Sequence, residues 1–164
     1  MEPEELLRKH NVTVPAVPVH KIAKLEGIQV VDIPAADDIS GALVRNGGRV
    51  IIAVNPRHHI HRRRFTVAHE LGHFFRHSNI ETHVDQDFRI DFRDARSSGA
   101  VDWMEITANE YAACLLMPTE FLLRDVTRRE YVTESLVTSL ATRYEVSTLA
   151  MRIRLTNLGM LPAV

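Results

Sequence analysis

The spacing of apolar residues along the first third of the chain predicts two short helices and a small sheet. The predicted helices span residues 3–10 and 19–25, and the predicted strands span residues 28–33, 39–45 and 49–54. Asn46-Gly47-Gly48 lies between the last two strands, and an Asn-Gly pair there is a strong signal for a hairpin turn. Helices combined with a hairpin predict an α+β fold that contains a small antiparallel sheet.

A longer helix is predicted directly after the sheet, over residues 64–77. Its apolar residues recur every three or four positions and form one stripe that can be buried; they are Val67, Leu71, Phe74 and Phe75. Gly72 lies in the middle of this helix, where glycine costs about 1 kcal/mol relative to alanine. We therefore expect another element to pack closely against Gly72.

The second half of the chain predicts one strand and further helices. Residues 87–93 alternate between charged and apolar, which is typical of a half-buried strand. A long helix is predicted to begin near Asp102 and to end before Pro118. Two shorter helices, over residues 135–144 and 147–158, are joined by a short link and resemble a helix-turn-helix in shape.

The sequence His69-Glu70-Leu-Gly-His73 places three chemically active side chains on the helix over residues 64–77. At about 100° of rotation per residue, His69 and His73 lie about 40° apart and one turn from each other on one face. Two imidazoles in this arrangement can bind one Zn²⁺ at about 2.0–2.1 Å, with Glu70 beside the ion. The sequence therefore predicts a zincin-type helix that binds one zinc ion.

A catalytic zinc site needs a third protein ligand and leaves one position open for water. The helix after Asp102 offers Glu105 and Glu110. Glu105 shares its helix face with small residues that would allow close approach, whereas Glu110 points about 140° away. We favour Glu105 and keep Glu110 in reserve, although Glu105 also fits a capping box with Asp102. Asn109, one turn further along, could orient a metal-bound imidazole.

Two longer motifs surround these residues: Phe65-Thr-Val-Ala-His-Glu-Leu-Gly-His73, and Glu105-Ile-Thr-Ala-Asn-Glu-Tyr-Ala-Ala-Cys-Leu-Leu-Met-Pro118. Together they resemble the ImmA/IrrE family of bacterial zinc metallopeptidases, and the resemblance runs from about Val17 to the C-terminus. It implies a gluzincin-like zinc endopeptidase with His69, His73 and Glu105 as ligands and Glu70 as catalytic base. It also implies a cytoplasmic role in gene regulation and stress response, commonly by cleavage of a helix-turn-helix repressor.

The chain departs from the family pattern at two positions. Thr107 stands where many members have a second acidic residue, and Tyr111 stands where phenylalanine is usual. Neither position is needed for the metal, so these departures put substrate preference in doubt rather than activity. The motifs divide the chain into a zinc metallopeptidase-like domain, residues 1–120, and a helical, helix-turn-helix-like subdomain, residues 121–164.

Peptide hydrolysis also requires a group that stabilises the tetrahedral oxyanion beyond the metal itself. His77, His83 and Tyr111 are the candidates, and the sequence does not choose among them. His77 could equally be a plain surface histidine. For His83 we favour a surface position.

Composition and charge limit the other functions. The chain has 164 residues, of which 45% are hydrophobic and 25% charged, as in ordinary soluble domains. Its single cysteine excludes an internal disulfide, and we find no signal peptide or apolar run of about 20 residues. We therefore expect a cytoplasmic protein without membrane contact.

Charge gives little sign of DNA binding. The net charge is −1, and the basic segment at residues 57–64 lacks interleaved aromatics, so we interpret it as the solvated entry to a helix. Between Leu123 and Asn157 six arginines face four acidic residues, which is a weak surplus for contacts with phosphates. We expect the C-terminal helices to support the cleft and hold a protein substrate.

Two other classes of function remain open. One is a DNA-binding regulator in which the metal is structural, and the other is an interaction protein or toxin that binds a partner without hydrolysis. Glu70 favours the peptidase, because a structural zinc site needs no adjacent base and usually closes its fourth position.

Overall fold

The computed structural model describes residues 1–77, 82–86, 99–126 and 132–162. The helices in these ranges are α1 (Pro3–Lys9), α2 (Val19–Leu25), α3 (Ile60–Arg76), α4 (Gly99–Leu116), α5 (Thr119–Val126), α6 (Glu134–Tyr144) and α7 (Thr148–Asn157). The strands are β1 (Ile28–Asp32), β2 (Ile39–Asn46), β3 (Arg49–Val54) and β4 (Thr82–Gln86). This order confirms the α+β fold and the hairpin predicted around Gly47.

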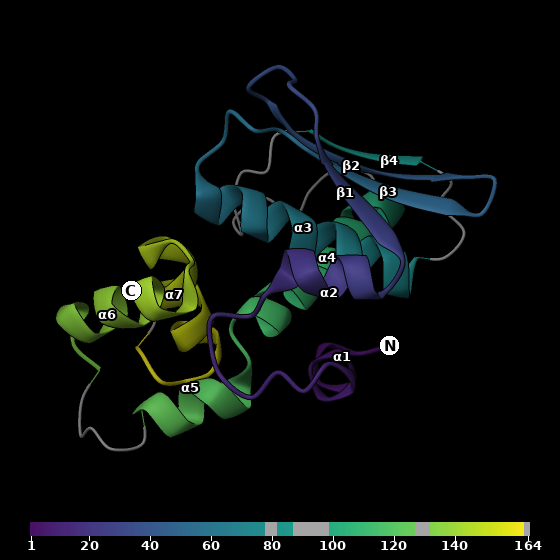
Figure 1. Cartoon of the computed structure of the whole chain (residues 1–164). Coiled ribbons are helices and arrows are strands. Elements are labelled where there is room, and N and C mark those ends of the chain that lie inside the picture. The colour runs from purple at the N-terminus through teal and green to yellow at the C-terminus, as the bar shows by residue number, and fades with distance from the viewer. Residues whose placement is uncertain (78–81, 87–98, 127–131, 163–164) are drawn as a thin grey trace.

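The sheet is mixed, with the strand order β1-β3-β2-β4 (Figure 1). Strand β2 is antiparallel to β3, as predicted, and also to β4, a strand that the sequence did not predict, whereas β1 pairs in parallel with β3. The small sheet is therefore not antiparallel throughout. The β2–β3 hairpin returns β3 in the direction of β1, and β3 rather than β2 takes the place beside β1.

Helix α3 lies at the centre of the fold, packed against β2 on one side and against α4 on another (Figure 1). Val67 and Leu71 of its predicted apolar stripe are fully inaccessible, and Phe74 and Phe75 pack partly buried against the same core. A Cβ atom at Gly72 would lie 3.1 Å from Cα of Ala108 and 3.0 Å from Cβ of Tyr111. The missing side chain therefore lets α3 and α4 approach closely, which confirms the prediction for Gly72.

One prediction about the second half of the chain was wrong. Helix α4 begins at Gly99, so Asp102 lies inside the helix and cannot be its N-cap, and the capping box with Glu105 was wrong. Gly99 and Ala100 are small residues that add little to a hydrophobic spacing pattern, so the pattern placed the start of the helix too late. The strand predicted at residues 87–93 lies outside the described residues.

The C-terminal helices form as predicted and are tied to the rest of the chain. Ser147 caps α7, its hydroxyl accepting a hydrogen bond from the Ala150 amide at 3.1 Å. The guanidinium of Arg64 donates to the Val17 carbonyl at 2.9 Å and to the Glu145 carbonyl at 3.2 Å. It thereby joins α3 to the link between α6 and α7.

Among the described helices, none combines the length and the apolar character that crossing a membrane requires.

Candidate metal centre

Four side chains from three elements meet at one point beside α3. His69 and His73 come from α3, His83 from β4 and Glu105 from α4. Each offers one ligand atom, and these atoms all lie within 4.8 Å of one another. The fold therefore brings together residues that are far apart in the sequence into a cluster that is compatible with a metal ion.

The spacing of the donor atoms tests whether an ion fits. The Nε2 atoms of His69 and His73 are 2.9 Å apart, and they lie 3.3 and 3.4 Å from the carboxylate oxygens of Glu105. Donors placed at about 2.0–2.1 Å around a tetrahedral zinc ion would be separated by about 3.3–3.4 Å. The cluster needs little movement to hold an ion of that size.

Glu110, the reserve ligand, lies outside the cluster. Its side chain is 65% exposed, and its carboxylate lies 3.9 Å from the guanidinium of Arg76. Glu105 is the carboxylate that faces the two histidines, because the small residues on its side of α4 pack against α3 as the helical wheel indicated.

Asn109 fixes the orientation of the His69 ring. Its side-chain oxygen lies 2.8 Å from Nδ1 of His69. An amide oxygen only accepts hydrogen bonds, so Nδ1 carries the hydrogen and the lone pair of Nε2 points into the cluster. The structure thus contains the contact that the sequence suggested for Asn109.

The ring of His73 is oriented by a longer chain of hydrogen bonds. The hydroxyl of Thr107 donates to the Met104 carbonyl at 3.0 Å, which leaves it to accept from Nε2 of His77 at 3.2 Å. Nδ1 of His77 then accepts from Nδ1 of His73 at 3.1 Å. This assignment leaves Nε2 of His73 free to bind an ion.

Thr107 was thus missed by the sequence interpretation, which assigned that position to substrate preference. Thr107 points about 160° away from Glu105 on the helical wheel, and its contact depends on the position of His77 just after the end of α3. Neither spacing nor composition reveals such a contact.

Glu70 has the least satisfied polar group of the site. Its residue is fully buried, and neither carboxylate oxygen has a hydrogen-bond partner among the described residues. The nearest cation is Nδ1 of His83, at 3.5 Å from Oε2. A buried carboxylate without donors is costly, so this position suits a group that receives a proton from a bound water or substrate.

His83 lies inside the cluster, whereas the sequence favoured a surface position. It pairs with Leu43 in the register of β4 and β2, and opposite residues share a face of the sheet. Because Leu43 is fully buried, His83 also faces α3. The prediction was wrong because the direction of the His83 side chain depends on how β4 pairs with the distant strand β2. The spacing of residues 82–86 alone carries no information about that pairing.

The charges in the cluster stabilise one another. Burial alone would raise the pKa of the Glu105 carboxyl, but its contacts with His69, His73 and His83 hold that pKa well below the usual range. Burial alone would lower the pKa of His83, but its contacts with Glu105 and Glu70 raise that pKa to about 10. In the metal-free protein His83 is therefore a cation between two carboxylates.

Tyr111 does not reach the cluster in this arrangement. It is fully buried, its ring stacks on Phe75, and the guanidinium of Arg76 lies 5.4 Å from the ring centroid. A substrate has no access to a hydroxyl in this position. His77 supports His73 from behind, so His83 is the one of the three oxyanion candidates that lies at the metal-binding atoms.

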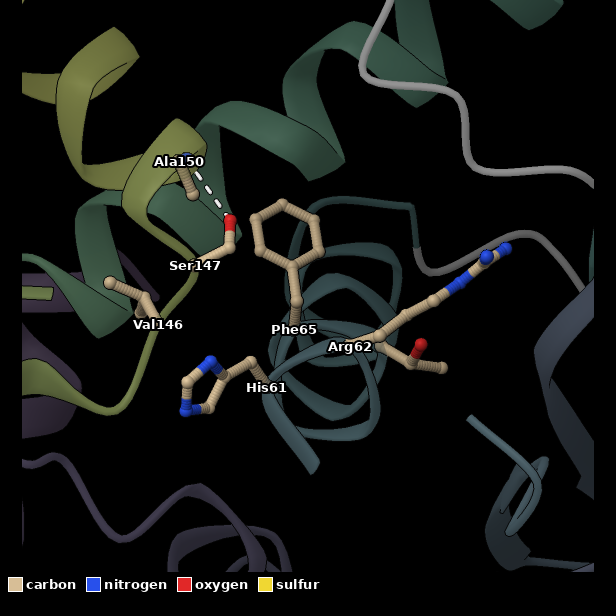
Figure 2. Close-up of a pocket in the computed structure, with 7 residues that line it drawn as sticks. His61, Arg62, Phe65, Val146, Ser147 and Ala150 are labelled. Carbon is tan, nitrogen blue, oxygen red and sulfur yellow. Dashed lines mark hydrogen bonds between the residues drawn. The ribbon is translucent and has the colours of Figure 1, made fainter. Parts of the chain in front are cut away.

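A small pocket opens one to two turns before His69 along α3. It has a volume of about 140 Å³ and is mainly apolar. Phe65 projects from α3 toward Ser147 and Ala150 at the start of α7 (Figure 2). The pocket is lined by His61, Arg62, Phe65, Thr66, Val146, Ser147 and Ala150. Arg62 lies within about 20° of His69 on the helical wheel, so the pocket and the cluster share one side of α3.

The fold and the cluster define a metallopeptidase-type domain. The chain matches the family model of the IrrE N-terminal-like domain, a peptidase family, over residues 23–156, and it belongs to that family. This confirms the resemblance to the ImmA/IrrE family that the two motifs carried.

Among solved structures, a transcriptional regulator from Mycobacterium tuberculosis has the same fold, with a TM-score of 0.65 and 16% sequence identity. The match covers 94% of this chain and 44% of the regulator, so the chain spans less than half the length of that protein. No curated protein matches the chain.

Proposed function

We propose that the protein is a zinc-dependent endopeptidase that cleaves a regulatory protein in the cytoplasm. The observation that carries this proposal is Glu70, a buried carboxylate without a hydrogen-bond donor beside a metal-compatible cluster. In this proposal His69, His73 and Glu105 hold the ion. A bound zinc ion would act as a Lewis acid toward a peptide carbonyl and would make water more acidic.

The chain's own residues carry the proton transfer. Glu70 accepts a proton from the attacking water and delivers it to the leaving amine, a general acid–base role that typically contributes about 10²–10⁴-fold. Asn109 and the chain from Thr107 through His77 keep the two imidazoles in the tautomers that bind metal through Nε2. The buried position of Glu70 keeps competing water away from its carboxylate.

The proposed substrate is a protein, most specifically a helix-turn-helix repressor, as the family resemblance implies. The pocket at Phe65 supports a role for the C-terminal helices in holding it. A cavity of about 150 Å³ accommodates one small aromatic molecule, so a pocket of about 140 Å³ suits one apolar side chain near the bond to be cleaved.

The contacts of the C-terminal arginines favour a protein partner over DNA. Arg154 donates to the Met117 carbonyl and Arg152 pairs with Glu134. Arg143 lies 3.3 Å from the carboxylate of Asp125. These guanidinium groups bind the protein itself, which leaves less positive charge for phosphates. Sequence-selective duplex binding that persists at about 150 mM salt would instead promote the DNA-binding regulator.

The test of the peptidase compares the zinc-loaded protein with its Glu70→Gln variant, each incubated with helix-turn-helix repressors as candidate substrates. We expect Glu70→Gln to retain zinc and fold but to lose cleavage by about 10²–10⁴-fold. Glu110→Gln, an exposed carboxylate on α4, is the matched control and should cleave normally. Equal cleavage by Glu70→Gln and the wild type would contradict the mechanism.

A further inference from the structure

His83 has no part in the proton transfer proposed above, yet it occupies the centre of the cluster. Its Nε2 atom lies 2.7 Å from Oε1 of Glu105, and its ring stacks on His73 with 3.8 Å between the ring centroids. The side chain is 15% exposed, so it is held by these contacts rather than projecting into solvent. The position of His83 beside the metal-binding atoms therefore indicates a function that the proton transfer does not include.

We propose that His83 is a fourth metal ligand in the substrate-free protein. Its Nε2 atom already approaches the Glu105 oxygen that lies 3.4 Å from His73. Because all four donor atoms lie within 4.8 Å of one another, shifts on the order of 1 Å bring them to the spacing of about 3.3–3.4 Å that a tetrahedral ion requires. The inference rests on the metal centre of the proposed function.

The second nitrogen of the His83 ring supports this assignment. A histidine that binds metal almost always donates its other N–H group to a carboxylate or carbonyl. Nδ1 of His83 lies 3.5 Å from Oε2 of Glu70, so Glu70 is the carboxylate that would accept this hydrogen. The same geometry disfavours His83 as a donor to the oxyanion, because its two ring nitrogens already face the carboxylates of Glu105 and Glu70.

A fourth protein ligand closes the position that a catalytic site leaves for water. His83 therefore has to withdraw before hydrolysis can begin. β4 is an edge strand of the described sheet and pairs there with β2, so its movement breaks one strand pairing rather than two. In this arrangement Glu70 is released from His83 at the same time as the fourth position opens.

The experiment measures metal binding directly. Cobalt(II) replaces zinc, and its visible absorption is recorded for the wild type, His83→Ala and Val84→Ala while thiocyanate is added. We expect thiocyanate to change the spectrum of His83→Ala at concentrations that leave the wild type unchanged, because only the variant has an open position. The Kd for zinc, measured against a chromophoric chelator, should rise by at least about tenfold in His83→Ala.

Val84→Ala is the matched control, because Val84 is 48% exposed on the same strand. It should behave like the wild type. Equal thiocyanate response and equal zinc affinity in the wild type and His83→Ala would overturn the proposal, as would a wild type that binds no cobalt. If His83 behaves as expected but no protein is cleaved, the ligand assignment stands and the peptidase proposal fails.

Discussion

Helix α3 carries two buried polar groups that differ in how their hydrogen bonds are satisfied. All three guanidinium nitrogens of Arg64, near its start, have partners: the Val17 carbonyl, the Glu145 carbonyl and the Glu145 carboxylate at 3.0 Å. Glu70, less than two turns later, has no hydrogen-bond partner for either oxygen among the described residues. Both residues are buried, with exposed fractions of 7% for Arg64 and 0% for Glu70, but only Arg64 has its polar atoms satisfied.

This difference separates structural from functional polar groups. A buried group with all its partners in place contributes to the fold and has no capacity left for a ligand. A buried group without partners raises the energy of the folded state, and it is retained where a ligand or a proton supplies the missing interaction. Replacing a polar group that has all its partners should therefore lower the stability of the fold and leave metal binding nearly unchanged. Replacing a polar group of the metal site should mainly weaken metal binding.

The largest expected effect concerns the carboxylate of the cluster. We expect Glu105→Ala to weaken zinc binding by more than about 100-fold, beyond the loss of a residue that only orients a ligand. Glu110→Ala should retain the metal. Metal content by mass spectrometry after mild chelation distinguishes them, and loss of zinc from Glu110→Ala alone would move the third ligand to that residue.

Arg64→Met tests the structural side of the comparison. The buried carbonyl of Val17 and the partly buried carbonyl of Glu145 lose their donor, so we expect the free energy of unfolding to fall by about 2–3 kcal/mol with little change in zinc affinity. Urea denaturation of the metal-free protein measures the first quantity. Arg63→Met removes a pair with the largely exposed Asp32 and should cost at most about 1 kcal/mol. Equal losses in both variants would remove the distinction.

Thr107→Val tests whether groups that do not touch the metal control its affinity. The hydroxyl that orients His77, and through it His73, is lost. We expect the Kd for zinc to rise by about tenfold while the fold is retained. Thr107→Ser keeps the hydroxyl and should restore binding. A valine variant that binds zinc as tightly as the wild type would show that His73 needs no such support.

The smallest expected change in stability comes from substitution of Glu26, a carboxylate whose oxygens both accept hydrogen bonds. It accepts hydrogen bonds from Lys9 at 2.9 Å and from His10 at 2.6 Å. Burial alone would raise its pKa, but these contacts lower it below the ordinary value of 4.5. Ionised Glu26 therefore stabilises the fold above about pH 4.5, and this contribution disappears as the pH falls through the lowered pKa.

We expect Glu26→Gln to cost at most about 1 kcal/mol at pH 7. The difference in unfolding free energy from the wild type should shrink in acid, as denaturation at several pH values would measure. A difference that stays constant down to pH 3 would mean that the charge of Glu26 contributes nothing.

Local spacing explains which parts of the site were predictable. His69, Glu70 and His73 lie within one helix, and Glu105 follows from the small residues on its face of α4, so helical geometry was sufficient. The positions of His83 and Thr107 in the site depend on the pairing of β4 with β2 and on a side chain just beyond α3. The parallel pairing of β1 with β3 was not predicted for the same reason, because strand order depends on contacts between distant parts of the sequence.

The close contact at Gly72 determines more than the packing of two helices. It fixes how closely the helix that carries the two histidines lies to the helix that carries Glu105. A side chain at position 72 would place its Cβ atom 3.1 Å from the Ala108 backbone, so the helices would have to separate and the present spacing of 3.3–3.4 Å between the histidine nitrogens and the Glu105 carboxylate would widen. The affinity for an ion would thus depend on a residue with no side chain and no contact with the metal-binding atoms.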